Sequence, residues 1–161
     1  MNLEEYQKKA ISKQPEHEKF LNWLKRNKPK NLDRIAEEKH DEVFAKIDCL
    51  SCGNCCRTTG PLITAQDVKK MAKAVNLSEK DFEATYLKID EDGDMVFQSM
   101  PCPFLGEDNY CFIYENRPKA CREFPHTDRR KLYQINHLTI KNTVICPAAY
   151  QIVEELKEFY S

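Results

Sequence analysis

The sequence predicts a small α+β domain that is mostly helical and rich in loops, with bound metal stapling its interior. Three observations support this class. No glycine occurs before Gly53, and the residues ahead of it follow a helical pattern. All eight cysteines lie between Cys49 and Cys146 among residues typical of turns. An apolar helical pattern then begins at Pro147, so we expect N-terminal helices, a cysteine-cluster centre and a C-terminal helix.

The N-terminal part of the chain predicts three helices. Apolar residues recur at helical spacing, and Pro15 and Pro29 mark the breaks between the helices. Lysine and glutamate fill the remaining faces, which is typical of solvated helix surfaces. We expect residues 1–45 to form a helical segment ahead of a metal-binding cysteine-cluster domain over residues 46–161.

Composition excludes several classes of function. The chain has 161 residues and a net charge of −1, so it lacks the basic surface of a nucleic-acid-binding protein. No apolar run is long enough to span a membrane, and the charged N-terminus does not resemble a secretory signal. We therefore expect a cytoplasmic protein that binds neither nucleic acid nor membrane, and a protein partner remains open. In a reducing compartment, cysteines serve as metal ligands more often than as disulfides.

The first half of the predicted metal chemistry is the run Cys49-Leu-Ser-Cys52-Gly-Asn-Cys55-Cys56. A Cys-x-x-Cys step allows a tight turn to direct two sulfurs at one ion, and Gly53 supplies a permissive backbone for such a turn. Side chains of adjacent residues diverge, so Cys55 and Cys56 are poorly placed to serve one mononuclear ion. The run predicts either two neighbouring metals or one multinuclear cluster.

The second half of the metal chemistry comes from four separate cysteines. Cys102 and Cys111 flank a turn sequence and are expected to face each other across a hairpin. Cys121 follows Pro118, which suits the start of a short helix, and Cys146 directly precedes the C-terminal helix. A thiolate at the positive end of a helix has a lowered pKa, which favours metal ligation.

Two arrangements of the eight sulfurs remain open, and two centres are favoured over one. Two tetrahedral zinc sites would each take four thiolates, with neighbouring cationic side chains offsetting their charge. Alternatively, three close cysteines and a distant Cys-Pro partly match the spacing of a ferredoxin iron–sulfur cluster. The other four cysteines then form a second set. The first set is Cys49, Cys52, Cys55 and Cys146; the second is Cys56, Cys102, Cys111 and Cys121; the cations are Arg57, Arg117, Lys119 and Arg122.

Histidines add little to this chemistry. His126 could be a ligand or a proton carrier, but eight thiols already saturate two four-ligand sites, which favours a surface or capping role. His17 and His40 lie on charged helices and are expected to be solvated. There is no glycine-rich phosphate loop or serine nucleophile elbow, so we assign no catalytic residue.

The middle of the chain carries local signals that fix its secondary structure. Capping boxes beginning at Thr64 and Ser78 predict two helices. The pair Asp92-Gly93 between two apolar stretches predicts a β-hairpin. The alternating Asp90, Asp92 and Asp94 resemble the start of a calcium loop, but the later positions do not fit one, so we interpret them as a solvated turn.

These motifs, taken together, resemble the YkgJ-type CxxCxxCC cysteine-cluster family over roughly residues 45–160. The resemblance rests on the cysteine run with Gly53, on Cys102-Pro-Phe-Leu, on Cys111-Phe-Ile-Tyr-Glu-Asn-Arg-Pro118 and on Ala-Cys121-Arg-Glu-Phe-Pro. Members are described as zinc- or iron-chelating, which implies that all eight cysteines are metal ligands. We expect a metal-binding protein with a structural, interaction or electron-transfer role; the alternative is a metal- or iron–sulfur-dependent enzyme of unknown substrate.

Overall fold

The computed structural model describes residues 3–48 and 52–161, and the chain divides into two compact units. The helical unit comprises residues 1–48 and 125–161, and the cysteine unit comprises residues 49–124. Helices dominate the described residues, where a single two-stranded sheet is found, which confirms the predicted mostly helical α+β class. The division into domains at residues 45 and 46 stays a prediction.

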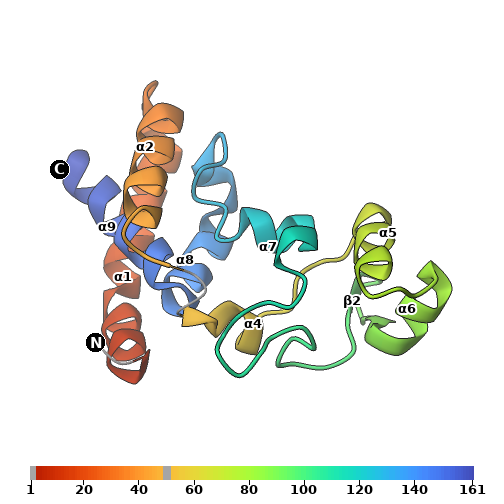
Figure 1. Cartoon of the computed structure of the whole chain (residues 1–161). Coiled ribbons are helices and arrows are strands. Elements are labelled where there is room, and N and C mark those ends of the chain that lie inside the picture. Colours follow the sequence, from red (N-terminus) through yellow and green to blue (C-terminus); the bar gives the residue numbers. More distant parts are fainter. Residues whose placement is uncertain (1–2, 49–51) are drawn as a thin grey trace. The chain divides into compact units, whose positions relative to one another are not determined.

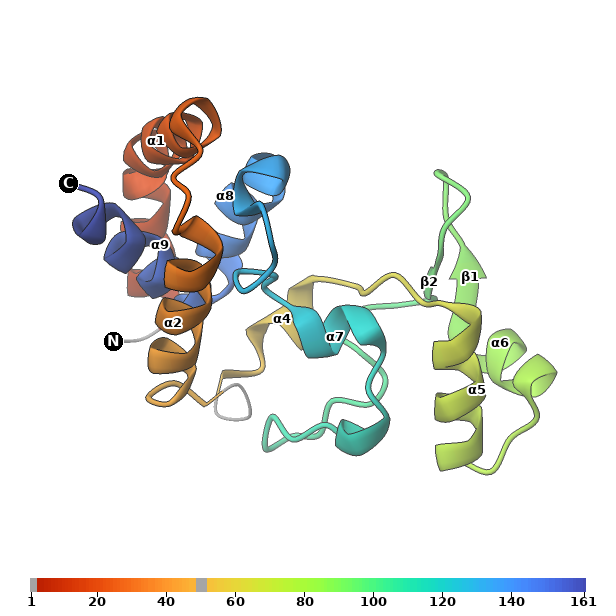
Figure 2. The ribbon, with the colours of Figure 1, turned by 90° about the horizontal axis from the view of Figure 1, so that it is seen from above.

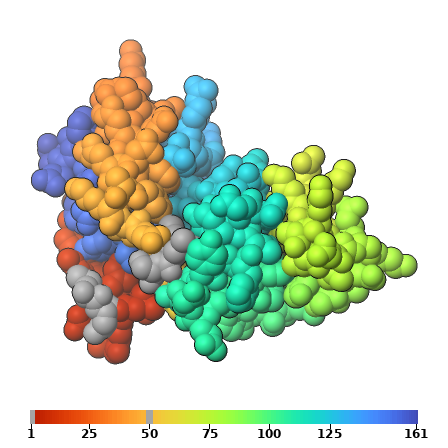
Figure 3. Space-filling model, viewed as in Figure 1, coloured from red at the N-terminus to blue at the C-terminus, as the bar shows by residue number. Residues whose placement is uncertain are grey.

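The helical unit is built from four helices and one short 3-10 turn (Figures 1 and 2). They are α1 (Leu3–Asn27), α2 (Leu32–Phe44), η2 (Leu132–Ile135), α8 (Asn136–Ile145) and α9 (Pro147–Phe159). α1 packs on α8, and α9 contacts α1, α2 and α8. The side chains of α2 lie directly against those of α9 in the space-filling view (Figure 3). Their shared apolar core includes the fully buried Leu21, Leu24 and Ile152.

The predicted break at Pro15 is wrong, because α1 runs through it as one helix of 25 residues. A proline inside a helix removes one backbone hydrogen bond and crowds the carbonyl four residues earlier. Both Pro15 and Ile11, which carries that carbonyl, are exposed. Solvent can therefore satisfy the freed group, while Ala10 and Leu21, buried on either side of the proline, hold the two halves in the core.

The predicted solvation of His17 is also wrong, because its side chain is completely buried between α1 and α9. Its Nε2 lies 2.6 Å from Oε1 of Glu154, which Lys157 also contacts at 3.2 Å. Among the described residues, none provides a hydrogen-bond partner for the buried Nδ1. The geometry fits a neutral ring that donates from Nε2 to Glu154, since protonation of Nδ1 would bury an unpaired donor.

The cysteine unit consists of short elements around a second apolar core. Its elements are α4 (Asn54–Thr58), α5 (Ala65–Ala74), α6 (Glu79–Tyr86), β1 (Leu87–Ile89), β2 (Met95–Phe97), η1 (Tyr114–Asn116) and α7 (Lys119–Glu123). α5 and α6 pack beside the β1–β2 hairpin (Figure 2). The rings of Phe82 and Phe104 stack with centroids 6.1 Å apart in this core. None of the described helices is both long enough and apolar enough to cross a membrane.

Local sequence signals in the cysteine unit are confirmed. The hydroxyl of Thr64 accepts a bond from the Asp67 amide at 3.1 Å, and the Asp67 carboxylate accepts one from the Thr64 amide at 2.9 Å. The hydroxyl of Ser78 likewise caps α6. β1 and β2 pair in antiparallel register across the turn that contains Gly93, as the Asp-Gly signal predicts.

The burial of His17 predicts a pH-dependent stability for the helical unit. Burial holds the pKa of His17 below its ordinary value, although the hydrogen bond to Glu154 acts in the opposite direction. The unfolded chain therefore binds a proton more readily, and the free energy of unfolding should fall as pH drops below about 6.5. Urea unfolding followed by fluorescence of Trp23, the single tryptophan of the chain, measures this slope. His17→Gln should lower the slope by up to about 1.4 kcal/mol per pH unit.

Replacing the exposed His137 by Gln is the matched control for that experiment. It removes an exposed imidazole and leaves the buried contact of His17 unchanged, so its profile should follow that of the natural chain. Parallel profiles for the natural chain and His17→Gln between pH 5 and 7 would show that the buried ring contributes no such dependence.

Candidate metal centre

The first cysteine segment enters the site through a left-handed turn. Gly53 has a φ of +60° and is the N-cap of α4, so Cys55 and Cys56 lie in the first turn of that helix. Consecutive helical residues are rotated by about 100° around the axis. The two thiols nevertheless remain close enough for a hydrogen bond between them, so they do not diverge as far as expected.

A backbone hydrogen bond joins this segment directly to the second cysteine segment. The amide of Cys102 donates to the carbonyl of Cys56 at 2.7 Å. Cys102 opens the predicted hairpin, whose turn is closed by a bond from the Gly106 amide to the Tyr110 carbonyl at 2.8 Å. The cross-strand bridge pairs Cys111 with Leu105, so Cys102 lies three residues before the position opposite Cys111.

Cys121 is placed by the short helix α7, as its position after Pro118 predicts. The Cys121 amide donates to the Pro118 carbonyl at 3.0 Å. The buried Asp67 anchors the start of this helix, because its Oδ1 accepts a hydrogen bond from the Lys119 amide at 3.0 Å. One carboxylate therefore caps α5 with one oxygen and ties α7 to α5 with the other.

Four thiols of the cysteine unit influence one another electrostatically: Cys56, Cys102, Cys111 and Cys121. Burial raises the pKa of Cys121 to about 12 and that of Cys102 to about 11, and the charge of Cys56 contributes in the same direction. Burial and Cys56 also raise the pKa of Cys111. These three thiols are therefore poor acids in the absence of a cation.

Cys56 differs from its three neighbours. The pKa of Cys56 is lowered to about 7, chiefly by a hydrogen bond from the Cys55 thiol and also by the positive charges of Arg117 and Arg57, which together outweigh the effect of burial. Arg117 is fixed by its own contacts, since Nε donates to the Tyr114 carbonyl at 3.0 Å and the guanidinium lies 3.9 Å from the centre of the Tyr114 ring. The site thus contains one readily ionised thiol, Cys56, whose charge is stabilised by the guanidinium groups of Arg57 and Arg117.

The donor set fits zinc or iron. Soft thiolates are the ligands both metals take in structural and iron–sulfur sites, and a cation would offset the cost of ionising the three buried thiols. None of the seven described cysteines forms a disulfide. Of the four predicted charge-offsetting side chains, Arg57 and Arg117 act on Cys56, whereas Lys119 lies 3.9 Å from the Glu123 carboxylate and Arg122 is exposed.

The remaining predicted site residues are placed differently. Cys49 lies outside the described residues. Cys52 is half-buried in the cysteine unit, directly before Gly53. Cys146 belongs to the helical unit, where its Sγ accepts a bond from the Ala149 amide at 3.4 Å and caps α9. His126 also belongs to the helical unit. Its surface or capping role stays a prediction.

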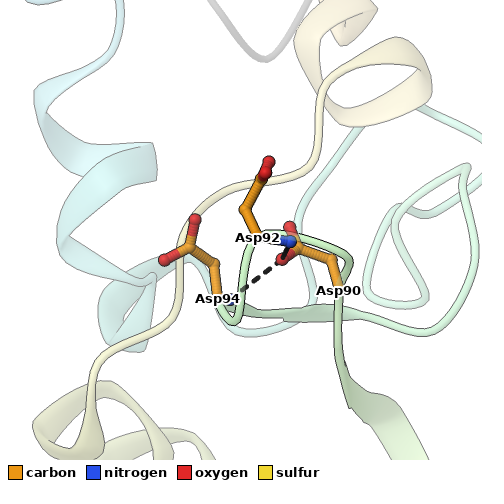
Figure 4. A group of neighbouring side chains, drawn as sticks. All are labelled: Asp90, Asp92 and Asp94. Carbon is orange, nitrogen blue, oxygen red and sulfur yellow. Dashed lines mark hydrogen bonds between the residues drawn. The ribbon is translucent and has the colours of Figure 1, made fainter.

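Within the described residues, one group of three potential ligand atoms lies mutually within 4.8 Å, and it contains no cysteine. It consists of Asp90, Asp92 and Asp94 in the β1–β2 turn (Figure 4). Oδ1 of Asp90 accepts bonds from the amides of Asp92 and Asp94 at 3.0 and 2.9 Å. These bonds explain the clustering as a local turn and agree with the interpretation of a solvated hairpin tip.

Sequence reasoning missed two residues that position the cysteine segments. Asp67 was expected to cap α5 and also anchors α7. Asn109 was expected to lie in a turn, and its side chain also receives a hydrogen bond from Nη2 of Arg57. Both additional contacts join residues 52 positions apart, and a local pattern carries no signal for them.

The double role of Asp67 predicts a measurable loss of stability when its carboxylate is removed. Asp67→Ala leaves two partly buried amides without their acceptor, which should cost about 2–3 kcal/mol. Asp67→Asn retains one carbonyl oxygen and should lose less. Urea unfolding of the reduced chain, followed by circular dichroism, measures the cost, and amide exchange at Lys119 reports the α7 contact.

Asp81→Ala is the matched control, because Asp81 occupies the equivalent position of α6 and is exposed. Its removal should cost under about 1 kcal/mol and leave exchange at Lys119 unchanged. An Asp67→Ala chain with unaltered exchange at Lys119 would contradict the anchoring role.

One family profile matches the chain. It is described as "CxxCxxCC: Putative zinc- or iron-chelating domain" and covers residues 48–147, which is more than half of the chain. The match includes all eight cysteines and confirms the resemblance drawn from the sequence. No curated protein and no solved structure matches the chain.

Proposed function

The chain belongs to this family of zinc- or iron-chelating domains, and on that premise we propose that the four mutually interacting thiols of the cysteine unit form one metal centre. These are Cys56, Cys102, Cys111 and Cys121. The observation that carries the proposal is the backbone bond from the Cys102 amide to the Cys56 carbonyl, and the effect of the Cys56 charge on the pKa values of the other three thiols supports it. Four thiolates complete the ligand set of a tetrahedral zinc or iron.

We propose that the other four cysteines serve a second centre. Cys49, Cys52 and Cys55 supply three thiols within seven residues, and Cys146 is the remaining candidate for the fourth. The support here is the Cys-x-x-Cys spacing, which suits a turn around one ion. The adjacent Cys55 and Cys56 then belong to different centres, which explains why two neighbouring thiols are present in one run.

The proposed role is metal binding that serves structure and interaction, or electron transfer where the centre is an iron–sulfur cluster. A closed set of four thiolates leaves no position for a substrate, so zinc there would order the short elements that carry the ligands. An iron–sulfur cluster at the same residues would supply one-electron chemistry. In both cases the chain's own contribution is to hold the thiols and to offset their charge with Arg57 and Arg117.

An enzyme dependent on the metal or cluster is the second candidate function. It requires an open coordination position, and the cysteine spacing supports it, because Cys49, Cys52 and Cys55 are close in the sequence whereas Cys146 is distant. A centre with three firm thiolates and a labile fourth ligand could accept a substrate. A cytoplasmic location is part of the proposal for either function, since reduced thiols are needed for ligation.

Single substitutions at the adjacent cysteines test the division into two centres. Cys56→Ser should remove the metal of the four-thiol centre, whereas Cys55→Ser should affect only the other one. Each variant should therefore keep about half of the metal bound by the natural chain. Metal content and acid-labile sulfide would be measured on chains purified without oxygen, alongside visible charge-transfer absorption.

The two variants act as controls for each other, since they differ by one position in the same helix. Circular dichroism and Trp23 fluorescence would verify that both chains are folded. Complete loss of metal in both variants would mean a single cooperative cluster and would overturn the two-centre arrangement. Sulfide in the natural chain identifies an iron–sulfur cluster, and zinc without sulfide identifies a zinc site.

A further inference from the structure

We propose that Arg57 and Asn109 form a clamp that holds the two cysteine-bearing segments of the proposed centre in register. Neither residue is a ligand, so both are positioning residues. The inference rests on the proposed function only in naming the metal centre as what the clamp serves. The clamp itself is a set of contacts between residues 52–57 and the hairpin that runs from Cys102 to Cys111.

The guanidinium of Arg57 provides the first set of contacts. Its Nη1 donates to the carbonyl of Cys52 at 2.9 Å, and its Nη2 donates to Oδ1 of Asn109. The planar fork of arginine allows both bonds at once with little loss of side-chain freedom per bond. A single side chain therefore links the backbone of the first segment to the turn of the second.

Close packing between Gly53 and Asn109 provides the second contact. A Cβ at residue 53 would lie 2.9 Å from Oδ1 of Asn109, a distance that real Cβ atoms essentially never show, and 3.0 Å from its Cβ, which is tighter than most real Cβ contacts. Gly53 is buried and has a left-handed backbone at φ +60°. The glycine is thus required for two reasons: its backbone conformation and the space that the Asn109 side chain occupies.

The conformation of Asn109 explains why this residue type reaches the turn. Its φ is +67°, a left-handed value that asparagine adopts more readily than most other non-glycine residues. Its amide donates to the Gly106 carbonyl at 3.1 Å, which closes the hairpin turn. The same residue therefore shapes the hairpin between Cys102 and Cys111 and directs its side chain onto Gly53.

The clamp matters for the centre because of where it acts. Arg57 directly follows Cys56, whose carbonyl already accepts the amide of Cys102. One backbone bond alone leaves the two segments free to pivot about it, and the Arg57–Asn109 contact adds a second tie from the neighbouring residue. Two ties fix the relative orientation of the Cys56 and Cys102 thiols before an ion binds, which reduces the ordering cost of binding.

The test measures binding of Zn²⁺ and Co²⁺ alone to the reduced, metal-free full chain by competition with a chromophoric chelator. Asn109→Ala and Arg57→Lys should each weaken the affinity about 10- to 100-fold, the range found when residues that orient ligands are changed. Asn109→Asp retains the acceptor oxygen and should recover binding to near the natural value. The visible spectrum of bound Co²⁺ reports whether a tetrahedral four-sulfur site still forms.

Two glycine substitutions form a matched pair for the packing contact. Gly53→Ala adds a Cβ in a left-handed turn and against Asn109, and it should weaken metal binding. Gly93→Ala adds a Cβ at φ +82° with no atom within 4 Å, so it carries the backbone strain without the contact. Gly93→Ala should bind metal as the natural chain does. Should Gly53→Ala fail to fold, the Asn109 and Arg57 variants decide the question.

The outcomes separate the clamp from the proposed centre. The clamp is overturned if Asn109→Ala and Arg57→Lys bind metal with the affinity of the natural chain and give an unchanged Co²⁺ spectrum, while Cys56→Ser loses its metal. This holds even if the two variants unfold more easily. Full metal content in Cys56→Ser would instead overturn the proposed centre. Weakened binding in Asn109→Ala with recovery in Asn109→Asp supports the clamp, because it assigns the loss of affinity to the oxygen that accepts the Arg57 bond.

Discussion

The hydrogen bond from the Cys102 amide to the Cys56 carbonyl is the contact on which the candidate centre depends. It brings together two segments 46 positions apart, each with at least one thiol, before any ion is considered. Protonated thiols carry no charge, so they can lie close together without electrostatic repulsion. Burial keeps three of the four protonated by raising their pKa values. The arrangement can therefore form first and ionise when a cation arrives.

The elements that carry the thiols are too short to be stable by themselves. α4 and α7 have five residues each, far below the length at which an isolated helix persists in water. Their positions are set by side-chain contacts across the chain, chiefly Asp67 with the start of α7 and Arg57 with Asn109. Polar tertiary contacts thus replace helix propensity as the source of order around the thiols.

The contrast between what the sequence predicts well and poorly follows from the range of the interactions. The caps at Thr64 and Ser78 and the turn at Gly93 involve residues a few positions apart, and all three are found where expected. Pro15 and His17 are governed instead by packing against helices from the other end of the chain, which overrides the local signal. The candidate metal centre combines both cases, because it depends on local turns and on contacts between distant segments.

Cysteine spacing identifies which residues are candidates for ligation, because a short turn constrains close thiols directly. Spacing alone left the arrangement of the eight sulfurs open, since the separation between Cys56 and the later cysteines is set by the hairpin and by α7. In the structure the charge of Cys56 acts on Cys102, Cys111 and Cys121, and the proposed grouping of these four thiols depends on long-range contacts such as the Cys102–Cys56 backbone bond.

The buried Phe104, in the hairpin between Cys102 and Cys111, links the apolar core of the cysteine unit to the chemistry of these two thiols. Phe104, between Cys102 and Cys111 in the chain, packs among Phe82, Tyr86 and Phe97. Both cysteines border the same cluster and lose much of their contact with water there. The packing that anchors the hairpin is therefore also the reason these thiols resist ionisation. A bound cation with high affinity for sulfur offsets the cost of the buried thiolate charge. A base in solution removes the proton but leaves that charge buried without a partner.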